Sequence, residues 1–192
     1  MDLTQGTQKE KNARAKKMML WFGIISLLMG FAGWTSAFIV SSSREDWLND
    51  FQLPTAFFYS TAVIVLSSFS YILAKNGIKK NDQKAGTNWL LITLVLGIVF
   101  IVLQFRGFSE IIAQGYYFTG PTSNITMSYI FLIATVHVLH VVAGIVSLVV
   151  VLVNQLRNKY SEEDHLGVEL GATFWHFLDL LWVYLMLFFY FF

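Results

Sequence analysis

Apolar residues gather into five long runs, and short polar connectors separate them. Each run reaches the roughly 20 residues that an α-helix needs to cross about 30 Å of hydrocarbon. The pattern predicts an all-α integral membrane protein with one transmembrane bundle at residues 18–192, after a basic tail at residues 1–17. The predicted helices cover residues 18–41, 55–74, 88–106, 127–153 and 166–192.

The composition agrees with a membrane protein. Only 13% of the residues are charged, against roughly a quarter in a soluble domain. The net charge of +1 gives no support for nucleic-acid binding, which needs a clustered basic face. The chain has no cysteine, which excludes disulfides, thiolate metal sites and cysteine nucleophiles.

Basic residues alternate along the chain in a way that predicts its orientation. The N-terminal tail, the second connector and the fourth connector carry five, four and two Lys or Arg, against one in each of the other two. This positive-inside bias predicts a cytoplasmic N-terminus and a periplasmic C-terminus. The first run is too long for a signal-peptide core of roughly 7–15 residues, so we expect it to be retained.

Two pairs of ionisable residues lie inside the apolar runs. His137 and His140 share one face of the fourth helix, and His176 and Asp179 share one face of the fifth. Both pairs lie about 10 to 16 residues from the inner ends of their helices. Because such groups are costly in lipid, we expect His140, His176 and Asp179 to cluster between these consecutive helices.

Several interpretations of this cluster remain open. It is consistent with a polar network that fixes how the helices pack, with a proton relay, and with contact to lipid or to a partner chain. Haem ligation is a further alternative, because imidazole binds iron well. A two-haem cytochrome usually needs four suitable histidines, however, and the fifth helix offers only His176 at depth.

A second polar group lies at the inner end of the last helix. Glu169 suits the positive end of the helix dipole in a first turn. Alternatively, Arg157 and His165 hold a lipid phosphate beside Glu169, as basic groups next to a membrane helix can do. No phosphate loop, nucleophile elbow or metal motif of known spacing is found. We therefore expect no catalytic, cofactor-binding or metal-ligating residue in this chain.

Three motifs resemble subunit III of the haem–copper oxidases. Residues 173–185 resemble its terminal Trp-His-Phe-x-Asp-x-x-Trp motif. Residues 135–144 resemble its His-Gly-Leu-His-x-x-x-Gly helix, and residues 165–172 its His-x-Gly-x-Glu-x-Gly-Ala segment. The order and spacing match from about residue 18 to 192. The terminal motif comprises Trp175, His176, Phe177, Asp179 and Trp182.

The resemblance is to the five-helix bacterial form and implies a multi-pass protein of the cytoplasmic membrane. It implies an accessory subunit without haem or copper, which are expected in its partners, subunits I and II. In that family, subunit III docks on subunit I, binds phospholipid in a cleft, supports proton uptake and slows inactivation. The complex reduces oxygen to water and pumps protons, and it can join a larger respiratory assembly.

The chain departs from the family at three points. Leu27 stands where the family often has a glutamate, and Val138 replaces a glycine. Asn154 replaces an arginine, for which Arg157 is the nearest substitute. The kind of complex to which the chain belongs remains open among three: a cytochrome c oxidase, a quinol oxidase and a nitric-oxide-reductase-associated complex. Alternatives from other classes are a haem-b membrane cytochrome and a small transporter.

Overall fold

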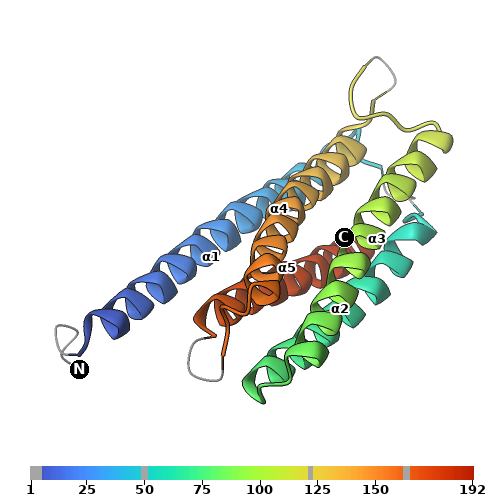
Figure 1. Cartoon of the computed structure of the whole chain (residues 1–192). Coiled ribbons are helices and arrows are strands. Elements are labelled where there is room, and N and C mark those ends of the chain that lie inside the picture. Colours follow the sequence, from blue (N-terminus) through green and yellow to red (C-terminus); the bar gives the residue numbers. More distant parts are fainter. Residues whose placement is uncertain (1–5, 49–51, 121–122, 162–164) are drawn as a thin grey trace.

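The computed structural model describes residues 6–48, 52–120, 123–161 and 165–192. Within this part of the chain it contains five α-helices and no strand (Figure 1). All five are long and apolar enough to cross a membrane, so the predicted all-α class with five membrane-spanning helices is confirmed. The helices are α1 (Gln8–Ser41), α2 (Thr55–Lys79), α3 (Gln83–Ala113), α4 (Ile125–Leu156) and α5 (Leu166–Phe191).

Most of the helices extend beyond the apolar runs that predict them. The clearest case is α1, which begins at Gln8 and therefore includes most of the segment predicted as a basic tail. A capping box explains this start, because Thr7 Oγ1 accepts from the Glu10 backbone N–H while Glu10 Oε2 accepts from the Thr7 N–H. Asp82 likewise caps α3 through the backbone N–H of Ala85. Hydropathy therefore predicts the part of a helix that crosses the membrane, whereas capping residues determine where the helix begins.

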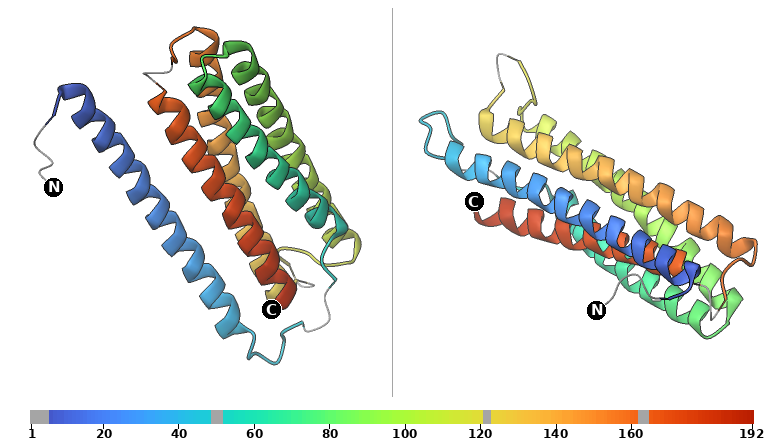
Figure 2. Two further views of the ribbon diagram at one scale, coloured as in Figure 1. Left: turned by 90° about the horizontal axis from the view of Figure 1, so that it is seen from below. Right: turned by 90° about the vertical axis from the view of Figure 1, so that its left-hand side faces the viewer.

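Helices α2 to α5 form a bundle, and α1 lies along one side of it, in contact with α4 and α5 (Figure 2). The tightest pairing is between α2 and α3. A Cβ added at Gly77 would lie 3.0 Å from the backbone nitrogen of Gly86, so the two helices approach almost backbone to backbone. Small residues permit this close approach in membrane bundles.

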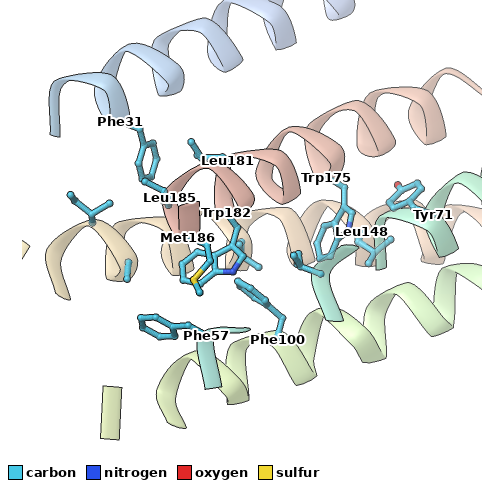
Figure 3. Packing of buried hydrophobic residues seen from close by; sticks show 14 of the residues in the cluster. Phe31, Phe57, Tyr71, Phe100, Leu148, Trp175, Leu181, Trp182, Leu185 and Met186 are labelled. Atoms are coloured by element: carbon cyan, nitrogen blue, oxygen red, sulfur yellow. The ribbon is translucent and has the colours of Figure 1, made fainter. Parts of the chain in front are cut away.

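Aromatic rings fill the middle of the bundle (Figure 3). Trp182 of α5 is fully buried and meets Phe57 and Phe100 edge to face, with ring centroids 5.5 and 5.4 Å apart. Trp175, nearer the start of the same helix, is also buried. Many large apolar side chains on the outer faces are exposed, as expected where lipid rather than water is the solvent.

Candidate functional site

The terminal motif on α5 is hydrogen-bonded to hydroxyl groups on α2. The indole Nε1 of Trp175 donates to Ser67 Oγ at 3.0 Å, and His176 Nδ1 lies 2.6 Å from Ser68 Oγ. Two turns beyond Trp175, the Nε1 of Trp182 donates to Oγ1 of Thr61 on α2, again at 3.0 Å. These contacts match the antiparallel course of the two helices, since later α5 residues meet earlier α2 residues.

Further hydroxyl groups of α2 bond to side chains of α3. Gln104 Nε2 donates to Ser60 Oγ at 2.8 Å, and the hydroxyls of Ser70 and Thr93 lie 2.7 Å apart. At the N-terminus of α2, the Thr55 hydroxyl donates to Glu110 Oε2 of α3 at 3.3 Å. Glu110 thereby lies at an N-terminus that has no side-chain cap of its own. Polar side chains on α2 thus connect it to two neighbours.

His137 is buried among aromatic rings. Its imidazole stacks on Trp182 with ring centroids 5.2 Å apart and an interplanar angle of 28°. Phe31 of α1 and Phe100 of α3 approach it edge-on, at 6.3 and 6.0 Å. His137 therefore packs at the meeting point of four helices.

His140 has a different environment from His137. Its Nδ1 lies 2.7 Å from the carbonyl oxygen of Val136 on its own helix. Its ring also meets Phe31, with centroids 5.8 Å apart. Phe31 thus touches both histidines of α4 and connects them to α1.

Asp179 is 4% exposed, and neither carboxyl oxygen has a hydrogen-bond partner among the described residues. The hydrogen bonds of His140 and His176 run to Val136 and Ser68 rather than to each other or to this carboxyl group. A direct His140–His176–Asp179 contact stays a prediction. What the structure shows is that the fifth-helix motif engages α2 as well as α4.

Near the N-terminus of α5, Glu169 contacts basic groups from α1, from α2 and from the N-cap residue of its own helix. Its carboxylate lies 3.3 Å from Lys17 Nζ of α1, 3.1 Å from Lys79 Nζ of α2 and 3.4 Å from His165 Nε2. Of the three residues predicted as a lipid contact, the structure therefore joins His165 and Glu169. Arg157 is the exposed C-cap residue of α4.

An apolar groove of about 690 Å³ lies between α1 and α5. Leu28 and Phe31 line it from α1, and Phe177 and Leu180 line it from α5. A smaller pocket of about 210 Å³ adjoins its inner end and shares lining residues with it. Its charged lining residues are Lys17, Lys75 and Glu169, and its other lining residues are Leu20, Trp21, Leu170 and Thr173.

The predicted site did not include the α2 hydroxyls or Lys75 and Lys79. A sequence signal for the hydroxyls exists, because Ser60 and Thr61 precede Ser67 and Ser68 by seven positions, two helical turns. Which helix these hydroxyls meet depends on the packing. In the described part of the chain, no three His, Asp or Glu side chains come close enough together to hold a metal ion.

The sequence is similar to known membrane proteins. A family model described as cytochrome c oxidase subunit III matches residues 44–192, which leaves α1 outside the match. The chain is 33% identical over 140 residues to cytochrome c oxidase subunit 3 of Spodoptera frugiperda, covering 71% of this chain and 87% of the relative. It is 31% identical over 157 residues to the subunit of the same name in Drosophila melanogaster, covering 80% of this chain and 53% of the relative.

A quinol oxidase subunit is also similar. Over 133 residues the chain is 30% identical to cytochrome bo(3) ubiquinol oxidase subunit 3 of Pseudomonas aeruginosa, covering 69% of this chain and 62% of the relative. The chain is 34% identical over 142 residues to cytochrome c oxidase subunit 3 of Tetraodon nigroviridis, covering 72% of this chain and 49% of the relative. The chain thus spans about half the length of several curated relatives that it matches.

Proposed function

Because the chain belongs to the cytochrome c oxidase subunit III family, we propose that it is a non-catalytic accessory subunit of a respiratory haem–copper oxygen reductase. It docks on the catalytic subunit I and belongs to a complex with subunit II, and the haem and copper are held by those partners. The family match over residues 44–192 is the observation that carries this proposal.

The contacts of the buried polar side chains support a scaffold role. Trp175, His176 and Trp182 use their ring nitrogens to bond hydroxyls of α2. His137 is packed against Trp182 and two phenylalanines. These groups hold five helices in one arrangement, and a rigid subunit of this kind supports assembly, proton uptake and sustained turnover of subunit I.

The groove between α1 and α5 supports a role in binding phospholipid. Its walls are apolar, and the pocket at its inner end presents Lys17 and Lys75. An acyl chain fits the apolar walls, and lysines at a membrane surface attract a phosphate. Glu169 lines this region and contacts His165 Nε2 at 3.4 Å, and Arg157 offers a further cation at the end of α4.

The membrane is proposed to be a bacterial cytoplasmic membrane, with the N-terminus on the cytoplasmic side. The positive-inside distribution supports this orientation. Cytochrome c is the proposed electron donor of the complex. Ubiquinol is the second candidate, because the P. aeruginosa relative carries the name of a ubiquinol oxidase subunit.

Deleting the chain from its host tests the proposed function. The tagged wild-type chain should co-purify with haem and copper spectra that belong to other subunits. Membranes without it should show slower proton uptake and progressive loss of oxygen reduction during turnover. An unchanged turnover profile would count against the role, and a Soret band from the isolated chain would overturn it.

A further inference from the structure

Helix α1 is held unevenly along its length. Towards its C-terminal end, Phe31 and Phe38 are buried, and Thr35 Oγ1 accepts from Tyr184 Oη at 3.1 Å. Ser41 Oγ lies 3.1 Å from Tyr129 Oη of α4. Phe38 alone meets four aromatic rings, those of Trp47, Tyr129, Phe188 and Phe189. This outer half of α1 is therefore fixed against both α4 and α5.

The inner half of α1 is held differently. From Gln8 to Gly23 no residue of α1 is buried, and Ile24 is the first that is. The ribbon shows the same asymmetry, because α1 and α5 lie farther apart near the start of α1 than near its end (Figure 2, left). The inner half of α1 therefore has fewer buried side chains than the outer half.

Grooves lie on both sides of this half of α1. The apolar groove of about 690 Å³ includes Trp21 and Leu28 on one side. A second groove of similar volume, about 690 Å³, includes Lys16 and Leu20 and runs between α1, α4 and α5. With a groove on each flank, no buried side chain of α1 from Gln8 to Gly23 opposes movement of this half away from the bundle.

An ionic bridge crosses between the two grooves. Glu169 of α5 contacts Lys17 of α1 at 3.3 Å and Lys79 of α2 at 3.1 Å, so one carboxylate connects three helices. The Glu169 side chain is 24% exposed, whereas the Lys17 side chain is 52% exposed. The Glu169 carboxylate is the less exposed of the two groups, and the Lys17 side chain reaches it from α1.

We propose that α1 is hinged at its outer end and latched at its inner end, with the Lys17–Glu169 ion pair as the latch. When the ion pair breaks, the inner half of α1 moves away from both α4 and α5, and both grooves widen. The aromatic contacts of Phe31 and Phe38 stay in place and act as the hinge. The latch follows from the geometry of this chain alone and does not depend on its place in an oxidase.

Distance measurements between spin labels test the latch. The chain has no cysteine, so spin labels can be attached at introduced cysteines alone. One pair, Ala15→Cys with Leu156→Cys, reports the distance between the inner ends of α1 and α4. A second pair, Val40→Cys with Leu187→Cys, reports the distance between the outer ends of α1 and α5. The measurement is made on the full chain in its purified membrane complex, with the unlabelled complex as background. In Glu169→Gln or Lys17→Gln, the population with a long inner distance should rise by up to about fivefold, the scale of one exposed ion pair. The outer distance should stay unchanged.

Lys16→Gln is the matched control, because it removes the same charge one position away without removing the Lys17–Glu169 contact. An inner distance that does not respond to Glu169→Gln or Lys17→Gln, or that responds equally to Lys16→Gln, would overturn the latch. If the complex with Glu169→Gln fails to assemble, the inner distance is measured instead in the wild-type complex at high salt. At 1 M salt the screening length falls to about 3 Å, and the latch then predicts the same rise in the long inner distance, whereas a constant distance would contradict it.

Discussion

Trp182 donates its indole N–H to Thr61 Oγ1 at 3.0 Å, and this bond joins the terminal motif of α5 to the opposite helix α2. Seven residues earlier on α5, Trp175 makes the equivalent bond to Ser67. Two indoles two turns apart therefore meet two hydroxyls that are six residues apart on the antiparallel partner. Sliding α5 along α2 by one turn would break both bonds, so the pair sets the register of the two helices.

Replacing Trp182 by Phe should destabilise the subunit. The change removes the donor to Thr61 and part of the ring that stacks on His137. Loss of one hydrogen bond costs about 0.5–1.5 kcal/mol, and the smaller ring adds a packing loss. A lower midpoint of thermal unfolding in nanodiscs checks this. Trp34→Phe, at an exposed position of α1, should leave the midpoint unchanged, and equal shifts in the two variants would contradict the register role.

Glycine-to-alanine changes should separate packed helix faces from open ones. A Cβ at Gly97 would lie 2.8 Å from Trp175 Cη2, whereas a Cβ at Gly30 would meet nothing within 4 Å. We expect Gly97→Ala to cost about 1–3 kcal/mol, as overpacking does in a filled core. Gly30→Ala should be close to neutral in the same unfolding assay. A loss of complex assembly in Gly30→Ala would show instead that a partner helix covers that face of α1.

Asp179→Ala should weaken assembly or sustained turnover without abolishing oxygen reduction. The Asp179 side chain is buried on α5 between Trp175 and Trp182, and its removal leaves a cavity in the bundle. Initial and late rates of oxygen consumption in the purified complex measure the effect. Asp179→Asn, which keeps the side-chain volume, should behave more like the wild type. Complete loss of the initial rate in a fully assembled Asp179→Ala complex would contradict the scaffold role.

Filling the apolar groove should displace lipid. Ala32 lines the groove between α1 and α5, so Ala32→Trp places a large ring where we propose an acyl chain. Native mass spectrometry of the complex should then show at least one phospholipid fewer. Ala143→Trp, on an exposed face of α4 outside this groove, is the control. Equal phospholipid counts in both variants would place the bound lipid elsewhere.

The proposed orientation can be tested by cysteine labelling, because the chain has no native cysteine. Ser43 follows α1 and Lys84 lies near the start of α3, and both are exposed. A membrane-impermeant maleimide added to spheroplasts should label Ser43→Cys, whereas Lys84→Cys should react only after lysis. The positive-inside distribution is the physical reason. The reverse labelling pattern would contradict a cytoplasmic N-terminus.

Different parts of this protein could be predicted from the sequence to different extents. The five spans are predicted because a lipid-length apolar run has few alternatives to a helix in hydrocarbon. The family could be named from Trp175, His176 and Asp179 because their spacing on α5 is local. The extension of α1 back to Gln8 was not predicted, because the Thr7–Glu10 capping box lies in a segment that is polar and carries no hydropathy signal.

The sequence by itself determined the class, the number of spans, the family and the position of each polar group along its helix. Only the tertiary structure decided what those groups contact. His176 bonds Ser68 of α2, His140 bonds its own helix, and Glu169 bridges α1 and α2. Helical periodicity fixes which side of one helix a residue occupies, but the rotation of each helix about its axis follows from close packing at glycines such as Gly77 and Gly97. Those rotations are collective, so no single motif encodes them.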